Sequence, residues 1–314
     1  MPARLIAIVG PTAAGKSPLS VRLAGEIGGE VVNADSMQLY RGMDVGTAKL
    51  ESAERGGVPH HLLDVWDIRQ TASVAGYQRM ARAAIEQILA RGKVPVLVGG
   101  SGLYVRAALD NLNFPGTDPQ VRARLEAEFA DLGPARLHER LRRLDPAAAA
   151  AILQGNGRRI VRALEVIELS GQPFTANLPT YESVYPVVHI GLQLPRKVLD
   201  DRIDARVAGM WRAGFVAEVQ RLEATGLRAA RTASRALGYA QVLRYLAGEW
   251  SQEHARSETV RATRRFARRQ EAWFRRDPRV RWLDPRETDV LAAALACWHQ
   301  PKGAEQPRTP GDVS

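Results

Sequence analysis

The sequence predicts an α/β fold, in which a P-loop parallel-sheet core with helices on both faces carries an all-helical insertion and a helical, basic C-terminal region. Three observations predict it. A β-branched apolar run at residues 5–9 leads into a glycine loop at 10–17, and helical spacing follows. Further apolar runs alternate with helical stretches, which is typical of a parallel sheet. Positive charge is concentrated in residues 196–286.

The glycine loop matches the pattern G-x-x-x-x-G-K-[ST], which is a phosphate-binding loop when it lies between a strand and a helix. Its glycines let backbone N–H groups surround phosphate oxygens, and the helix N-terminus that follows adds partial positive charge. Lys16 supplies a cation, and the Ser17 hydroxyl suits Mg²⁺, the cofactor that this pattern indicates. We expect phosphate to be bound by Gly10, Pro11, Thr12, Ala13, Ala14, Gly15, Lys16 and Ser17.

The order of apolar and helical segments predicts how the chain is divided. The remaining strands are expected at residues 30–34, 93–98, 187–194 and 281–283. Residues 113–186 contain helical patterns with no strand signal, so we interpret them as a helical insertion. The core then consists of residues 1–112 and 187–300. The tail, 301–314, is polar and rich in Pro and Gly, and we expect it to be disordered.

Polar side chains follow two of the predicted strands. Asp35 follows strand 30–34, and Ser101 lies in a second glycine turn, Gly99-Gly100-Ser101-Gly102, after strand 93–98. Strand ends of this kind are where open α/β sheets place their chemistry. Asp35 could hold a metal through water, accept a proton from a nucleophile, or cap the next helix. His60-His61 is not expected to bind a metal, because adjacent histidines point in different directions.

Composition narrows the class of protein. The 314 residues include one cysteine, Cys297, which excludes an internal disulfide and a cysteine metal cluster. No apolar run approaches the roughly 20 residues that span a bilayer. The sequence enters its first strand directly, so we expect no export signal, a reducing cytoplasm and no membrane partner. We also expect a monomer.

The net charge of +10 comes from one region. Residues 196–286 contain 21 Arg and Lys against 11 Asp and Glu, which equals the excess of the whole chain. The segment 259–276 is an Arg-rich helix whose spacing fits contacts to a nucleic-acid backbone. A solvated helical surface is the alternative. Its rings, Phe266, Trp273 and Phe274, can pack inward or present a face to a base.

The sequence resembles a known family, the tRNA dimethylallyltransferases. The resemblance covers about residues 4–285. It rests on segments in the family's order, namely the P-loop, Asn33-Ala34-Asp35-Ser36-Met37-Gln38-Leu39-Tyr40, Gly46-Thr47-Ala48-Lys49, Pro59-His60-His61-Leu62, Val98-Gly99-Gly100-Ser101-Gly102-Leu103-Tyr104, Arg158-Arg159-Ile160-Val161-Arg162-Ala163-Leu164-Glu165-Val166 and Arg268-Arg269-Gln270-Glu271-Ala272-Trp273-Phe274.

The resemblance implies transfer of a dimethylallyl group from dimethylallyl diphosphate to the exocyclic amine of the adenosine 3′ of the tRNA anticodon. The P-loop would hold the diphosphate, and Asp35 would accept a proton from the attacking amine or orient it. Ser101 stands where the family usually has threonine, and it keeps the hydroxyl. Lys16 with Arg202 or Arg206, which share a helix face, would neutralise the leaving diphosphate.

The same resemblance implies that the helical insertion clasps the anticodon stem. It implies tRNA contacts by Asp35, Ser36, Met37, Gln38, Ser101, Arg158, Arg159, Ile160, Val161, Arg162, Arg268, Arg269, Gln270, Trp273 and Arg275.

Two other functions remain open from the residues themselves. A small-molecule P-loop kinase using ATP would explain the loop and Mg²⁺, although it leaves the Arg-rich region unexplained. An RNA-binding protein that has lost catalysis would explain the charge. Retention of Lys16, Ser17, Asp35 and Ser101 argues against this second alternative.

Overall fold

The computed structural model describes residues 4–112, 114–174, 181–286 and 289–299, so the predicted disordered tail lies outside the described residues. The chain forms two compact units. One comprises Met1–Leu109 with Ser183–Ser314, and the other comprises Asp110–Glu182, so both of its boundaries fall a few residues earlier than those of the predicted insertion. Val184 N donates to Leu109 O over 2.7 Å, and Asn111 N donates to Glu182 O over 2.9 Å.

The core of the first unit is a six-stranded sheet with the order β3-β2-β4-β1-β5-β6, and every neighbouring pair is parallel. This confirms the predicted parallel sheet. The sequence did not predict β3, which is two residues long and pairs with β2 at the edge. The strands are β1 (Leu5–Val9), β2 (Gly29–Asn33), β3 (His60–His61), β4 (Val94–Val98), β5 (Val187–Leu192) and β6 (Arg281–Leu283).

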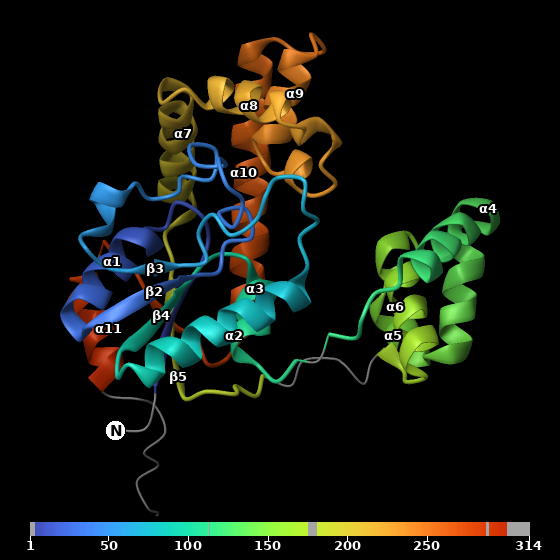
Figure 1. Cartoon of the computed structure of the whole chain (residues 1–314), viewed down its shortest axis with the longest axis horizontal. Coiled ribbons are helices and arrows are strands. Elements are labelled where there is room, and N and C mark those ends of the chain that lie inside the picture. The colour runs from blue at the N-terminus through green and yellow to red at the C-terminus, as the bar shows by residue number, and fades with distance from the viewer. Residues whose placement is uncertain (1–3, 113, 175–180, 287–288, 300–314) are drawn as a thin grey trace, which may run out of the picture. The chain divides into compact units, whose positions relative to one another are not determined.

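Both faces of the sheet are covered, which is why the central strand β1 is apolar and buried at every position rather than alternating. Side chains of one face, such as Ile6, Ile8 and Val96, pack with α1 and α11. Helices α2 and α3 lie on the opposite face (Figure 1). These four helices are α1 (Lys16–Ile27), α2 (Val74–Ala90), α3 (Gly102–Leu109) and α11 (Val290–His299).

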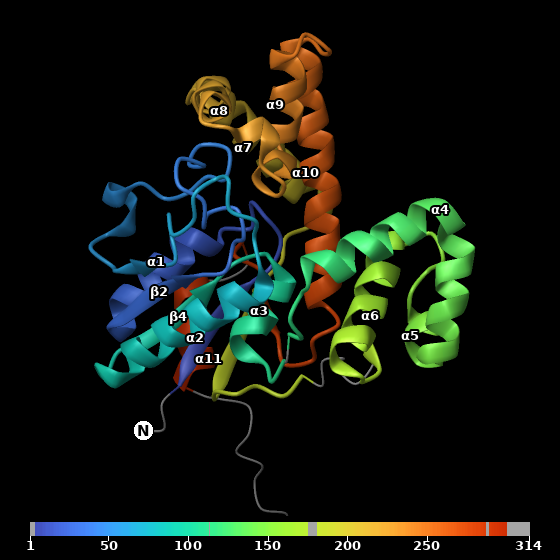
Figure 2. The ribbon, with the colours of Figure 1, turned by 45° about the vertical axis from the view of Figure 1, so that its right-hand side comes forward.

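The C-terminal helices extend the first unit beyond the carboxyl edge of the sheet. Helices α7, α8 and α9 gather around one end of the long helix α10 (Figures 1 and 2). A second apolar cluster, which includes Tyr40, Met43, Phe215 and Tyr239, packs them against the loop that follows β2. The helices are α7 (Arg196–Arg212), α8 (Phe215–Ala224), α9 (Tyr239–Leu246) and α10 (Gln252–Phe274), with short 3₁₀ turns η1 (Ser52–Arg55), η3 (Leu227–Ala229) and η4 (Ala233–Arg235).

The second unit is helical, with α4 (Pro119–Leu144), α5 (Pro146–Ala151) and α6 (Gly157–Ser170). Pro134 breaks α4, because the preceding Gly133 adopts φ 76° and ψ 169° and so leaves the helical conformation. Leu125, Leu137 and Ile160 belong to an apolar core that this unit forms for itself.

Candidate active site at the carboxyl edge of the sheet

Strand order brings the three predicted functional segments together. Strands β2, β4 and β1 are consecutive neighbours and parallel, so their carboxyl ends share one edge. Asp35 follows β2, the Ser101 turn follows β4, and the P-loop follows β1. Thr12, Asp35 and Ser101 line one cavity. Residues from both glycine turns, Thr12 and Ser101, therefore line the same cavity as Asp35.

The P-loop has the tight geometry that its glycines allow. Gly10 adopts φ 132°, and a Cβ there would lie 2.6 Å from the carbonyl oxygen of Leu192 in β5. Gly15 adopts φ 99° and caps α1. Lys16 Nζ donates to Pro11 O over 2.7 Å, which holds the ammonium group over the loop. The loop thus presents α1's free N-terminal amides and a fixed cation at the edge of the sheet.

The cavity combines charged and apolar surfaces. Its polar lining comes from the strand ends together with Arg206 of α7 and Arg235. Most of its apolar lining comes from the C-terminal helices and the segments between them, and includes Val207, Met210, Phe215, Leu237, Tyr239 and Phe266. A ligand with an anionic end and a short hydrocarbon part matches both surfaces.

Three charges interact where the P-loop meets this cavity, which Asp35 and Arg206 line. Burial is the main cause that lowers the pKa of Lys16 to about 7, the nearby Arg206 lowers it further, and Asp35 opposes the shift. Burial also lowers the pKa of Arg206, again opposed by Asp35. Two cations held close together with one carboxylate form a site that favours an added anion.

Asp35 and Ser101 are oriented by local hydrogen bonds. Asp35 Oδ1 accepts from Met37 N over 2.9 Å, while its own N–H donates to Asn33 Oδ1 over 2.9 Å. Asp35 Oδ2 forms no hydrogen bond within the described part of the chain, so it is available to a ligand. Ser101 Oγ accepts from Ser36 N over 3.2 Å and donates to Ser36 Oγ over 3.3 Å.

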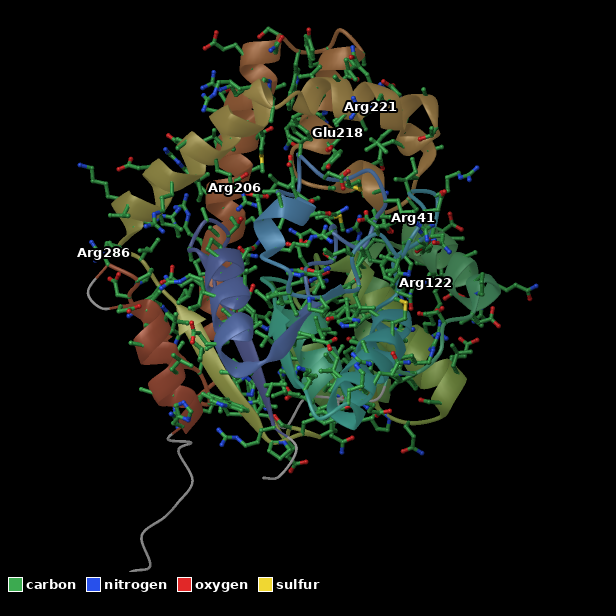
Figure 3. All side chains as sticks on the ribbon, turned by 60° about the vertical axis from the view of Figure 1, so that its left-hand side comes forward. Arg41, Arg122, Arg206, Glu218, Arg221 and Arg286 are labelled. Carbon is green, nitrogen blue, oxygen red and sulfur yellow. The ribbon has the colours of Figure 1, made fainter. Side chains whose placement is uncertain are left out.

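The structure separates the two arginines that the sequence could not. Arg206 lines the cavity and donates to Thr47 O over 3.2 Å. Arg202, four residues earlier on α7, is exposed and does not line the cavity. Figure 3 labels Arg206, a residue of α7, and Glu218, a residue of α8.

Comparison with known proteins identifies the family. The profile described as IPP transferase matches residues 38–277, which is most of the chain. The chain belongs to the IPP transferase family. A relative from Thermobifida fusca, named tRNA dimethylallyltransferase, is 67% identical over 302 residues, which cover 94% of this chain and 95% of the relative.

Solved structures agree with this membership of the IPP transferase family. The tRNA isopentenylpyrophosphate transferase of Bacillus halodurans is 41% identical, with a TM-score of 0.70 over 95% of this chain and 97% of its own. A eukaryotic dimethylallyltransferase acting on tRNA is 26% identical, with a TM-score of 0.80 over 93% of this chain and 77% of its own.

Glu218 is a buried residue of this IPP transferase family member that the sequence did not single out. Its carboxylate, 2% exposed, accepts from the N–H groups of Asp44, Val45 and Gly46 over 2.7–3.1 Å. It also accepts from the Tyr239 hydroxyl over 2.6 Å. Glu218 therefore joins the loop after β2 to the helices that line the cavity. An acidic residue within an apolar run, Phe215-Val216-Ala217-Glu218-Val219, is the signal that could have identified it.

We expect Glu218→Gln to lower the free energy of unfolding by about 1–3 kcal/mol, because the amide NH₂ faces backbone donors that then lose their acceptor. Urea denaturation measures the change. The matched control is Glu249→Gln, since Glu249 is exposed and its ion pair with Arg244 spans 3.8 Å. A surface pair contributes about 0–1 kcal/mol. Equal effects of both substitutions would contradict the structural role of Glu218.

The Arg-rich helix of this family member, α10, has an exposed charged face. Arg265, Arg268 and Arg269 are exposed and form no ion pair among the described residues. Its two acidic neighbours are engaged elsewhere, because Glu258 pairs with Arg261 and Glu271 pairs with Arg275. Of its rings, Phe274 is buried, Phe266 lines the cavity, and Trp273 is 43% exposed.

The position of Gln270 does not fit its predicted contact with tRNA. The sequence assigned it to the tRNA contacts, but its side chain is 5% exposed and fully engaged within the protein. Its Oε1 accepts from Thr12 N over 2.8 Å, and its Nε2 donates to Gly100 O over 3.0 Å. A side chain with both ends bonded inside the protein does not reach a bound RNA.

Of the predicted tRNA contacts in the helical unit, two are buried and a third is engaged within the unit. Ile160 and Val161 are 0% and 4% exposed and pack in the core of this unit, so their side chains do not face RNA. Arg162 bonds with the buried Glu165 and donates to backbone carbonyls at residues 115 and 116. Arg158 and Arg159, in the first turn of α6, are exposed.

Helices long and apolar enough to cross a bilayer are not found among the described residues.

Proposed function

We propose that this chain transfers a dimethylallyl group from dimethylallyl diphosphate to the exocyclic amine of the adenosine 3′ of the tRNA anticodon. The products are N6-dimethylallyladenosine and diphosphate. One observation carries the proposal: a P-loop, a carboxylate at a strand end and an apolar lining share one cavity. The names of the relatives support it.

The diphosphate end of the donor is assigned to the P-loop. Backbone amides at the start of α1, the Lys16 ammonium and the Arg206 guanidinium offer hydrogen bonds and positive charge to the phosphates. As the C1–O bond breaks, the electron pair leaves with the diphosphate, and these groups stabilise the growing negative charge. The apolar lining then accommodates the five-carbon group.

The residues fit a magnesium ion that is shared with the diphosphate. The half-buried Ser17 hydroxyl forms no hydrogen bond within the described residues and lies in the first turn of α1. Mg²⁺ usually keeps several waters and takes few protein ligands in addition to phosphate oxygens. When bound, it would neutralise charge on the diphosphate, and Ser17 would hold it.

The acceptor side of the reaction is assigned to Asp35 and Ser101. The adenine amine attacks C1 of the dimethylallyl group, forms the C–N bond and loses one proton. Asp35 Oδ2 takes that proton, while the hydrogen bond from Met37 N keeps the carboxylate oriented. The Ser101 hydroxyl, beside Ser36, lies where it can position the amine.

The tRNA is assigned to the exposed arginines of α10 and to Arg158 and Arg159 of α6. Arginine on an exposed helix face is suited to phosphate contacts. The target base leaves its stack to enter the cavity, because enzymes that modify a base need access to its edge. A tRNA substrate is the basis for proposing a cytoplasmic enzyme.

One incubation distinguishes this function from the ATP-dependent kinase. The protein is mixed with bulk tRNA, Mg²⁺ and either dimethylallyl diphosphate or ATP, and digested nucleosides are analysed by mass spectrometry. We expect an adenosine that carries the added dimethylallyl mass, formed only with the diphosphate donor. Consumption of ATP with no modified adenosine would overturn the proposal in favour of a kinase.

The lowered pKa of Lys16 predicts how donor affinity depends on pH. Below pH 7 the free protein already carries the charged ammonium. Above pH 7, binding of the anion must be accompanied by uptake of a proton, so affinity should fall by up to about tenfold per pH unit. Calorimetric titration with dimethylallyl diphosphate from pH 6 to 9 measures this change in donor affinity.

The variants Lys16→Arg and Lys16→Ala provide the controls for this prediction. Arginine stays protonated at these pH values, so we expect Lys16→Arg to flatten the pH dependence. Lys16→Ala should weaken donor binding at every pH and leave tRNA binding unchanged. A wild-type pH profile identical to that of Lys16→Arg would contradict the titration of Lys16.

A further inference from the structure

The side-chain amide of Gln270 joins the two glycine turns of the cavity. It projects from α10 and uses both of its ends, the oxygen toward Thr12 N at 2.8 Å and the nitrogen toward Gly100 O at 3.0 Å. A buried amide is costly unless both groups are bonded. Gln270 is only 5% exposed, so its two hydrogen bonds, and not packing alone, explain why a glutamine occupies this position.

The bond to Thr12 reaches Lys16 through one peptide unit. The N–H of the Pro11–Thr12 peptide donates to Gln270, and the C=O of the same peptide accepts from Lys16 Nζ over 2.7 Å. A planar peptide turns as one body, so fixing its N–H also fixes its C=O. Gln270 thus determines where the P-loop cation is held.

The bond to Gly100 reaches Ser101 in the same way. The turn leaves no room on either side: a Cβ on Gly100 would collide with the Gln270 amide, and one on Gly102 would collide with the Trp273 ring. A Cβ on Gly99 would collide with the backbone of Ala34, next to Asp35. The turn is therefore held between α10 and the end of β2.

The structure assigns Gln270 as a positioning residue of the active site, which fixes Lys16 through the Pro11–Thr12 peptide and Ser101 through Gly100. This inference rests on the proposed function for the roles of Lys16 and Ser101. It predicts that Gln270 affects binding of the diphosphate and the rate of transfer, and does not affect binding of the RNA.

The test compares Gln270→Met with wild type. Methionine keeps the length of the side chain and removes both hydrogen bonds. Gln270→Asn, which keeps the amide on a side chain one methylene shorter, serves as a milder second variant. The matched control is Gln252→Met in the exposed first turn of the same helix. Inorganic pyrophosphate with Mg²⁺ is titrated calorimetrically, and its stoichiometry reports the folded fraction. Labelled anticodon stem-loop measures RNA affinity, and steady-state assays give kcat and KM.

For Gln270→Met we expect pyrophosphate affinity and kcat each to fall about tenfold or more, as the loss of bonds that orient a charged group predicts. Gln270→Asn should show smaller losses of the same kind. RNA affinity should be unchanged in both, and Gln252→Met should match wild type throughout.

Two results would overturn the inference. Wild-type pyrophosphate affinity and kcat in the folded fraction of Gln270→Met would leave Gln270 with a merely structural role. Loss of RNA affinity with unchanged pyrophosphate binding would restore it as a tRNA contact. Pyrophosphate binding is measured without transfer, so a wild type that binds pyrophosphate but never modifies tRNA would overturn the proposed function alone.

Discussion

Replacing Asp35 with asparagine should lower the rate of prenyl transfer by about 10²–10⁴-fold, the usual effect of removing a proton-accepting group. Asparagine can keep the hydrogen bond that Met37 N donates to this side chain, so the loop after β2 should retain its shape. Asp35→Ala removes that bond as well and should be no more active. Single-turnover assays with excess enzyme measure the rate directly.

Binding measurements provide the control for Asp35. We expect the affinity for the anticodon stem-loop to stay within a few-fold of wild type, because one uncharged substitution at the cavity leaves the α10 arginines in place. Affinity for dimethylallyl diphosphate should be unchanged or tighter, since a negative charge near the phosphates is lost. An Asp35→Asn rate above about a tenth of wild type would show that another group takes the proton.

Changing Arg265, Arg268 and Arg269 together to glutamine should weaken tRNA binding by about 10²-fold at moderate salt, if each contacts a phosphate. The slope of log affinity against log salt should shrink by roughly 0.7–0.9 for each arginine–phosphate interaction that the substitutions remove. Glutamine preserves helix propensity. These three arginine side chains are exposed, and the nearby Glu258 and Glu271 pair with other arginines. Replacing the three arginines therefore breaks no ion pair within the described residues.

A second charge-removing variant serves as the control for the arginines. Lys93→Gln removes an exposed charge that directly precedes β4, at the amino edge of the sheet and away from the cavity. We expect that variant to keep the wild-type salt slope. Fluorescence anisotropy with labelled anticodon stem-loop at several salt concentrations measures the affinity and the salt slope of each variant. An unchanged slope in a folded triple variant would assign the charge of α10 to another partner.

The parts of the site that follow strands could be predicted from sequence, because local patterns determine them. The P-loop, Asp35 and Ser101 each directly follow an apolar β-branched run, and parallel pairing places such ends at one edge. The match to the IPP transferase family confirms the predicted family. The other half of the cavity comes from residues 207–266, whose helical spacing does not reveal which side chains meet Asp35.

The predicted tRNA contacts at Ile160, Val161 and Gln270, whose side chains are buried, share one physical cause. The motifs at 158–162 and 268–275 were assigned as continuous stretches, yet a helix turns its residues toward opposite faces every two positions. Arg158 and Arg159 face outward while Ile160 and Val161 face the core, and Arg268 and Arg269 face outward while Gln270 faces the P-loop. Applying the helical period to each motif would have separated these residues.

The chain leaves the first unit and returns to it through two segments that lie side by side. Leu109 bonds with Val184 on one side of the boundary, and Asn111 bonds with Glu182 on the other. Because the two ends are adjacent, closing the gap with a short linker costs little chain entropy. The helical unit forms its own core and has adjacent ends, so we expect that it can be replaced without disturbing the first unit. Such units can be lengthened, traded between relatives or replaced in protein engineering while the strands that carry the chemistry keep their register.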